Sequence, residues 1–292
     1  MKILAATRAY ETYEDYEASG KFDDAQLKQI ALGFRSSLPP KSISLYADPA
    51  FDHNQMEIIR MALDKGNSRR LVTFMADPRF DLGQLREIMF CIEDNPPIEA
   101  LDLVADPKFS ADQMHQIIAA MLMDGVTLDD IRVFAKPEFS RGQMAEASRA
   151  VEDYAISSAD FRKYTQPEYN PRMLRVIYYA IETKSFSYET IDQFIEICLT
   201  HDISDINNFT DSKFGYMMGG IQKGLSLELI EYLFFEQPFT IRQLYEILIG
   251  LSAGLTPEEV MSYADPKLAE VSMAKIRDKL RMTKAIGRIR DD

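Results

Sequence analysis

The chain has 292 residues, of which 46% are hydrophobic and 27% charged, so it can bury a large core and is not a disordered polypeptide. Its formal net charge of −13 argues against broad binding to nucleic-acid phosphates, which needs clustered Lys and Arg, and favours a basic protein or peptide as partner. Two cysteines make no disulfide framework. The first apolar run is too short for a signal peptide, and no stretch approaches the ~20 apolar residues of a membrane span, so we expect a cytoplasmic protein without membrane association.

Residues 1–21 are predicted to form an N-terminal capping helix that ends near Gly20. From residue 22 to 183 a pattern recurs every 29 or 30 residues, each time beginning at an aromatic anchor. The anchors are Phe22, Phe51, Phe80, Phe109, Phe139 and Tyr169. Self-similarity at a fixed period near 30 is typical of proteins built from stacked repeats.

One repeat begins with a long helix. In the copy at Phe51, Asp52 can cap the helix and Gln55 follows three residues later, which is the spacing of a capping box. The same pairing recurs as Asp23/Gln26, Asp81/Gln84, Ser110/Gln113, Ser140/Gln143 and Thr240/Gln243. Apolar residues five, eight and twelve positions after the anchor form one helical face. A small residue at position eleven is predicted to let a neighbouring helix approach closely, and it is Gly33, Ala62, Cys91, Ala120, Ala150, Ala180 or Gly250.

A glycine turn and a shorter helix complete the repeat. Several long helices are predicted to stop at glycine, which reaches positive φ without strain, namely at Gly66, Gly125, Gly224 and Gly254. A Ser or Thr then caps the second helix, as at Thr127, Ser226 and Thr256. This helix ends at a recurring Ala-Asp-Pro, because proline restricts the residue before it, as at Ala47-Asp48-Pro49.

The register changes after Tyr169. The next plausible anchor is Phe186, 17 residues on, and Phe214, Phe239 and Leu268 follow. The fold prediction is therefore all-α, an α-solenoid of about nine to ten helix-turn-helix repeats of roughly 30 residues. It has regular repeats over 22–183, degenerate repeats over 184–268 with an irregular elbow near 184–212, and a C-terminal capping helix over 269–292. The alternative is two helical domains joined at the elbow, although no Gly/Ser/Pro-rich linker separates them.

The repeat Ala-Asp-Pro-x-Phe-Asp/Ser-x-x-Gln-Met, with Gly-Leu-Ser/Thr between its helices, resembles a known group of proteins. These are poorly characterised tandem helical-repeat proteins of Gram-positive gut bacteria, often encoded on mobile elements. The resemblance covers roughly residues 22–270, and the copies from Tyr169 to Phe239 depart from the pattern. It implies a bacterial helical-repeat fold and carries no established activity.

Motifs for chemistry are missing from the sequence. It has three histidines, no His-Glu-x-x-His, no Cys-x-x-Cys and no phosphate-binding glycine loop. We therefore expect no catalytic residue, no metal site and no cofactor, and the chain is not predicted to be an enzyme. A nucleophile and base brought together from distant segments stays open as an alternative, because triads assemble across sequence.

Aspartates recur at one position of the repeat and could form a row of carboxylates that binds cations or a basic ligand. The residues assigned to it are Asp48, Asp77, Asp106, Asp211 and Asp265. The alternative is that Asp before Pro starts a turn. The same position also accepts Lys136 and Gln166, which favours the turn.

The candidate partner-binding site is a tyrosine-rich stretch at the change of register, because amphipathic aromatic residues are favoured at interfaces. Its residues are Tyr154, Tyr164, Tyr178, Tyr179 and Tyr188. Alternatively, these rings replace Phe and Leu in the core of degenerate repeats. Together with the repeat array and the acidic charge, the stretch predicts a non-catalytic protein- or peptide-binding scaffold whose pathway and oligomeric state the sequence does not indicate.

A second functional hypothesis uses the basic end of the chain. Its cationic residues are Lys275, Lys279, Arg281, Lys284 and Arg288. They could serve a nucleic-acid-associated accessory protein of a mobile element. The alternative is a solvated last helix whose cations lie near its C-terminal end, where the helix dipole favours them.

Overall fold

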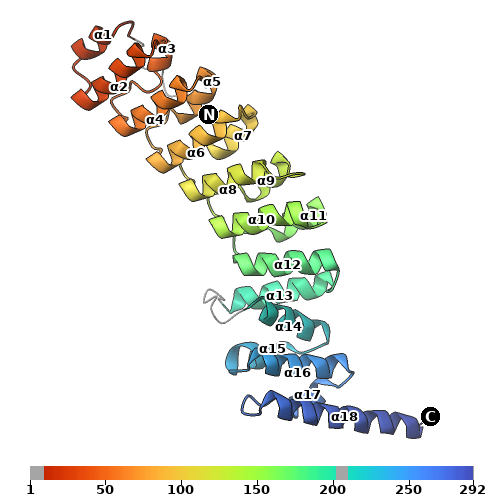
Figure 1. Ribbon diagram of the computed structural model, residues 1–292. Helices are drawn as coiled ribbons and strands as arrows, with labels where there is room; N and C mark the ends of the chain where they lie inside the picture. Colours follow the sequence, from red (N-terminus) through yellow and green to blue (C-terminus); the bar gives the residue numbers. More distant parts are fainter. Residues whose placement is uncertain (1–9, 202–209, 292) are drawn as a thin grey trace. The chain divides into compact units, whose positions relative to one another are not determined.

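The computed structural model describes residues 10–201 and 210–291, and the side chains of the last helix up to residue 286. Within these residues the chain forms helices and no β-strand, so the all-α prediction is confirmed (Figure 1). The chain divides into two compact units, Met1–Glu152 (unit 1) and Asp153–Asp292 (unit 2). None of the described helices combines the length and the apolar character needed to cross a membrane.

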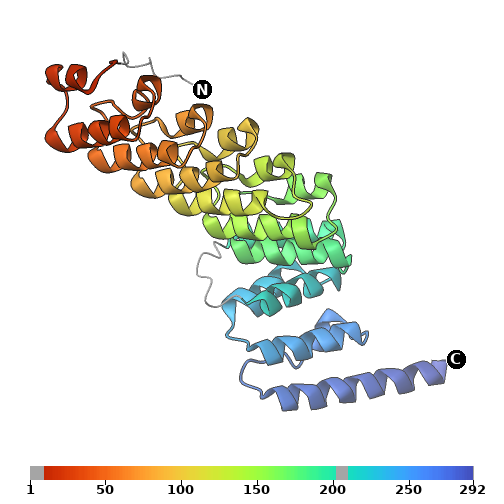
Figure 2. The same cartoon turned by 45° about the horizontal axis from the view of Figure 1, so that its top comes forward.

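Unit 1 alternates long and short helices after a first short helix, α1 (Tyr13–Ala18). The long helices are α2 (Asp24–Arg35), α4 (His53–Asp64), α6 (Leu82–Glu93), α8 (Ala111–Met121) and α10 (Arg141–Asp153). The short ones are α3 (Pro40–Ile43), α5 (Arg69–Val72) with the 3-10 turn η1 (Thr73–Met75), α7 (Ile98–Val104) and α9 (Leu128–Phe134). Helix α2 packs on α4, α4 on α6 and α6 on α8, and these long helices form one layer beside the short ones (Figure 2).

Unit 2 continues the alternation. Its elements are α11 (Ser158–Tyr164), α12 (Pro171–Thr183), α13 (Tyr188–Thr200), α14 (Asp211–Gln222), α15 (Leu227–Glu231), the π-helical turn η3 (Tyr232–Glu236), α16 (Ile241–Ser252), α17 (Pro257–Met261) and α18 (Glu270–Asp291). Helix α12 packs on α14, α14 on α16 and α16 on α18, while α13 also packs on α14. In both units, helices therefore pack mainly on near neighbours in the chain, as in an α-solenoid.

The predicted helix starts and stops are present. The side chains of Asp52 and Gln55 each bond the other's backbone N–H at the start of α4, and the five other predicted pairs make the same two bonds. The glycines predicted to stop long helices have φ between +77° and +88°, a range that side chains disfavour, and they are Gly66, Gly125, Gly224 and Gly254.

The capping glutamine has a second role that the capping-box pattern did not predict. The Oε1 atom of Gln55 accepts the N–H of Asp52 at 2.8 Å, while its Nε2 atom donates to the carbonyls of Pro78 and Phe80 at 3.1 and 2.7 Å. Those carbonyls belong to the turn that leads into the next long helix. The same two donations are made by Gln26, Gln84, Gln113 and Gln243, all of which are buried. We call this contact the glutamine bridge.

The predicted close approach at position eleven is clearest where that residue is glycine. A Cβ atom on Gly33 would clash with the hydroxyl of Tyr46, and one on Gly250 would clash with the hydroxyl of Tyr263. Each tyrosine lies just after the short helix that follows, and its hydroxyl donates to a carbonyl of the long helix, with Tyr263 bonding the Glu246 carbonyl at 3.3 Å. The tyrosine phenol therefore fills the space that a side chain on the glycine would occupy.

Two anchors after the change of register were assigned wrongly. Phe186 precedes Ser187, the N-cap of α13, and so takes the position that Leu225 holds before the short helix α15. Phe214 lies inside α14, whose N-cap is Thr210. The error at Phe186 arises because an apolar residue before a Ser or Thr cap starts both kinds of helix. The error at Phe214 arises because a hydrophobic staple also has an apolar residue four positions after the cap, here Thr210. Residues 202–209 of the predicted elbow lie outside the described residues, as do residues 1–9 of the predicted first helix and Asp292 at the end of the predicted last helix.

Replacing Gln55 by Glu should lower the free energy of unfolding of unit 1 by roughly 2–4 kcal/mol at pH 7, because a carboxylate faces two carbonyls without a proton to donate. The fold then favours the neutral acid, so the introduced carboxyl has a raised pKa. The stability that the protonated carboxyl provides is fully present below about pH 4.3, the pKa of this group in the unfolded chain. It is lost as the pH rises through the raised pKa of the group in the folded protein. Urea unfolding of Gln55→Glu and wild type at pH 7 and 4.5 should show the deficit shrinking on acidification. Gln116→Glu, at a half-buried position of α8 outside the bridge, is the control, and an equal deficit in both variants would contradict the bridge.

Gly250→Ala should destabilise unit 2 by roughly 1–3 kcal/mol through overpacking, although alanine is the better helix former. Tyr263→Phe removes the clashing oxygen and should restore most of the loss in the double variant. Gly215→Ala in α14 is the matched control, because a Cβ atom there meets no atom within 4 Å, and it should be neutral or stabilising. Thermal unfolding of the four proteins tests this, and a Gly250→Ala variant as stable as the control would refute the packing argument.

Candidate functional site

The five tyrosines of the predicted site lie in different environments. Tyr164 and Tyr178 are fully buried, and the Tyr178 hydroxyl shares a 2.8 Å hydrogen bond with Thr165 Oγ1 in the interior. Tyr154 is half-buried, whereas Tyr179 and Tyr188 expose 56% and 52% of their surface. The expectation of a partner contact is therefore corrected for Tyr164 and Tyr178, for which the alternative of core packing holds.

Tyr188 is exposed and yet held in place. It is the first residue of α13, after the N-cap Ser187. Its ring stacks on that of Tyr164 in α11, with centroids 6.3 Å apart and planes 5° from parallel. Its hydroxyl donates to Asp160 at 2.9 Å, and this hydrogen bond to a carboxylate raises the pKa of Tyr188. One side of the ring thus rests on α11 while half of its surface faces solvent.

A second set of contacts joins α11 to α13 at Asp192. The Tyr164 hydroxyl donates to Asp192 Oδ1 at 2.8 Å, and Lys163 Nζ donates to the two Asp192 oxygens at 3.1 and 2.9 Å. The same ammonium donates to the Tyr164 hydroxyl at 2.8 Å and lies 4.5 Å from its ring centroid. These bonds, first to Tyr164 and then to Asp192, raise the pKa of Lys163 and keep it a cation. The two helices are therefore cross-linked by a polar network.

Helix α13 presents a continuous outer stripe. Its contacts with α11 place it beside the short helices, yet it has 13 residues, as many as the long helices α10 and α12, against 4 to 7 for the short helices that the structure describes. Its inner face, with Ile191, Phe194 and Cys198, is buried in the core of unit 2. The outer face carries exposed residues at positions i, i+4, i+8 and i+11, which lie on one side of a helix. We call this set the α13 stripe, and it consists of Tyr188, Asp192, Glu196 and Leu199.

The charge of this surface is mainly negative. Glu189 is exposed beside the stripe, and Glu196 forms no ion pair with any residue within 10–201 and 210–286. Lys163 is the cation that contacts the stripe, and it is already bound to Asp192. An exposed tyrosine at one end and an exposed leucine at the other therefore flank a pair of acids.

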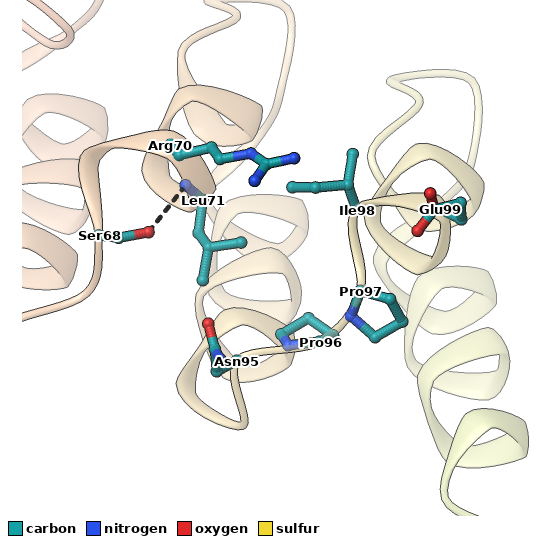
Figure 3. Close-up of a pocket in the computed structure, with 8 residues that line it drawn as sticks. All are labelled: Ser68, Arg70, Leu71, Asn95, Pro96, Pro97, Ile98 and Glu99. Atoms are coloured by element: carbon teal, nitrogen blue, oxygen red, sulfur yellow. Dashed lines mark hydrogen bonds between the residues drawn. The ribbon is translucent and has the colours of Figure 1, made fainter.

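A cavity of about 400 Å³ lies in unit 1 between the turn that precedes α5 and the turn that precedes α7 (Figure 3). Arg70 and Ile98 extend toward each other across it, while Asn95, Pro96 and Pro97 line one wall (Figure 3). Of its eight lining residues, Ser68 has the one hydroxyl, and Ser68 Oγ accepts the N–H of Leu71 at 3.4 Å as a helix cap. The cavity offers no activated nucleophile and no base beside one.

The recurring aspartates stabilise turns. Asp77 Oδ1 accepts the N–H of Arg79 at 3.0 Å, and equivalent bonds hold the turns at Asp48, Asp106 and Asp265. Asp211 was assigned to this row wrongly, because it is the first residue of α14 and pairs with Arg175 at 3.2 Å. Over the described residues, no group of three or more His, Cys, Asp or Glu is arranged to hold a metal ion.

The basic residues of α18 are not equivalent. Lys275 and Lys279 are exposed and make no ion pair within the part of the chain that the structure describes. Arg281 lies 3.8 Å from Asp278, and Lys284 donates to Glu259 and to the Gly254 carbonyl, both at 2.8 Å. The side chain of Arg288 lies outside the described residues.

Sequence reasoning missed Asp192, Glu196 and Leu199. Their signal was the regular spacing of polar and apolar residues after the cap at Ser187. It was hidden because Phe186 was interpreted as the anchor of a new long helix. Comparison of the chain with protein-family models, curated proteins and solved structures found no match.

Both thiols should be unreactive in the native protein. Burial raises the pKa of Cys91 in α6 to about 11 and also raises that of Cys198 in α13, so little thiolate is present at pH 8. We expect labelling with a disulfide reagent at pH 8 to be roughly 100-fold slower than in urea-unfolded chain. Cys198→Ala and Cys91→Ala variants leave one thiol in unit 1 and one in unit 2, so they report on each unit separately. Rapid native labelling of Cys198 would show that α13 does not stay packed.

Proposed function

We propose that this chain is a non-catalytic scaffold of the α-solenoid type and that it binds a basic, amphipathic segment of a protein or peptide on the α13 stripe. The observation that carries the proposal is the stripe itself, in which Tyr188 and Leu199, both about half exposed, flank the acids Asp192 and Glu196. Exposed aromatic residues with acids beside them suit a partner that has apolar residues between Lys or Arg.

The positions of the helix caps support a solenoid. N-cap residues of the long helices recur about every 30 residues, with one longer interval of about 40 that contains α13. They are Asp23, Asp52, Asp81, Ser110, Ser140, Asn170, Thr210 and Thr240. We infer eight helix pairs followed by α18, which is fewer than the nine to ten repeats expected from the sequence. The elongated α13 is then an insertion in the array, and insertions in repeat proteins are often used for binding.

The network beneath the stripe supports binding by a preorganised surface. Tyr188 is fixed by its stack on Tyr164 and its bond to Asp160, and Asp192 is fixed by Lys163. Side chains that are already ordered lose less conformational entropy when a partner binds. A fixed aromatic ring beside an oriented carboxylate is therefore a better anchor than side chains that must be ordered on binding.

A second candidate function is association with nucleic acid through the basic α18, in keeping with the resemblance to proteins often encoded on mobile elements. It is favoured by Lys275 and Lys279, which are exposed and without an ion pair within the described residues. The net negative charge of the chain opposes this binding, because nucleic-acid phosphates are also negative. Binding of this kind would weaken steeply with salt.

The proposal is tested with a synthetic helical peptide of alternating Leu and Lys faces and a matched peptide with Glu in place of Lys. Fluorescence anisotropy with the full chain should show micromolar binding of the basic peptide and none of the acidic one. Tyr188→Ala with Glu196→Lys should weaken the basic peptide at least about tenfold, because the variant loses an anchor and reverses a charge.

Tyr179→Ala is the matched control, since it removes an equally exposed ring from another helix and should leave the affinity unchanged. Equal binding of the basic peptide to wild type and to the stripe variant would refute the site. Duplex DNA titrated in the same assay addresses the second candidate, which requires binding that Lys275→Glu with Lys279→Glu abolishes.

A further inference from the structure

Helix α18 has an outer stripe of its own. Its inner face packs on the rest of unit 2 through the buried Met273 and through Arg277, whose guanidinium pairs with Glu246 of α16. On the outer face, Val271 and Met282 expose 60% and 67% of their surface. Lys275 and Lys279 lie between them and are exposed. We call Val271, Lys275, Lys279 and Met282 the α18 stripe.

The two stripes have the same spacing and opposite charge. In each, apolar residues occupy positions i and i+11 and charged residues occupy i+4 and i+8. The charges are Asp192 and Glu196 on α13, and Lys275 and Lys279 on α18. At 1.5 Å per residue, the apolar ends of each stripe lie about 16 Å apart. Laid side by side, the helices place apolar ends against apolar ends and cations against carboxylates.

Other exposed faces match the α18 stripe less well. The exposed Met61 of α4 lies among Glu57, Arg60 and Asp64, where Arg60 already pairs with both acids. The exposed Phe90 of α6 is followed by Glu93, which pairs with Lys65. Charges of both signs on those faces remove the electrostatic preference for a basic helix.

The two stripes of one molecule are kept apart by the packing of unit 2. Helix α13 packs on α14, α14 on α16 and α16 on α18, so the helices α14 and α16 lie between the two stripes (Figure 1). We propose that the α18 stripe of one copy of this chain docks on the α13 stripe of a second copy. This inference rests on the proposed function, for which it identifies the basic amphipathic partner as the protein's own last described helix.

The contact joins two different surfaces, so it is heterologous. Each copy in a pair keeps one free α13 stripe and one free α18 stripe, and association can continue beyond a dimer. Four residues on each side make a small interface, for which dissociation constants in the tens of micromolar, roughly, are expected. Exposed ion pairs are screened by salt, so raising the ionic strength should weaken the association.

Sedimentation velocity of the full chain from about 5 to about 300 µM tests the proposal at low salt. The wild type should show a sedimentation coefficient that rises with concentration at low salt and rises less at about 0.5 M salt. Lys275→Glu with Lys279→Glu makes both stripes acidic, and Glu189→Lys with Glu196→Lys makes the α13 face basic without touching the Lys163–Asp192 pair. Each variant alone should stay monomeric, whereas an equimolar mixture should associate because each supplies the charge that the other lacks.

Glu99→Lys with Asp102→Lys on α7 is the control for the basic variant, since it changes the net charge as Glu189→Lys with Glu196→Lys does and should associate like wild type. Circular dichroism verifies that each variant is folded. A wild type that is monomeric throughout, or variants that self-associate like it, overturns the proposal. If the wild type is monomeric but binding of the basic peptide still requires the α13 stripe, the proposed function stands and self-association fails. If binding of the peptide does not require the stripe, the proposed function and self-association both fail.

Discussion

A buried glutamine amide has two chemically different ends, and this chain uses both at the junction between successive long helices. The oxygen of Gln55 closes the capping box of its own helix, and the nitrogen donates to two carbonyls in the turn before the next one. Because a buried amide must satisfy both its donor and its acceptor, the start of one helix sets the position of the next. Glutamate, which serves equally well in a capping box, lacks the donor for the second half of the contact.

The turns are arranged to present those carbonyls. Asp77 holds its turn through the N–H of Arg79, and the carbonyls of Pro78 and Phe80 then point toward Gln55. Proline has no N–H, so this part of the turn presents an acceptor without a competing donor. The aspartate, the proline and the glutamine therefore form one structural unit. The same short sequence motif recurs along the chain because this unit is used at successive junctions.

Residues that stack the helices are already in use, so the proposed binding depends on side chains at the surface. The glutamines at the starts of α2, α4, α6, α8 and α16 are occupied by capping and bridging, and the recurring apolar residues by the core. The proposed binding surface lies on the largest departure from this pattern, the 13-residue helix α13. Its length exposes a stripe with two apolar ends, while Tyr164 and Lys163 of α11 hold the first half of that stripe in place.

The sequence alone determined where most helices begin and end, because caps and glycine stops act between residues no more than about five positions apart. It also determined the position of the small residue that admits Tyr46 beside Gly33. Tertiary structure decided the second role of Gln55, whose partners are 23 and 25 residues away, and the exposure of Tyr188 as against the burial of Tyr164. It likewise decided that Phe186 precedes a short-layer helix, because a cap pattern shows that a helix begins and carries no information about the layer in which it packs.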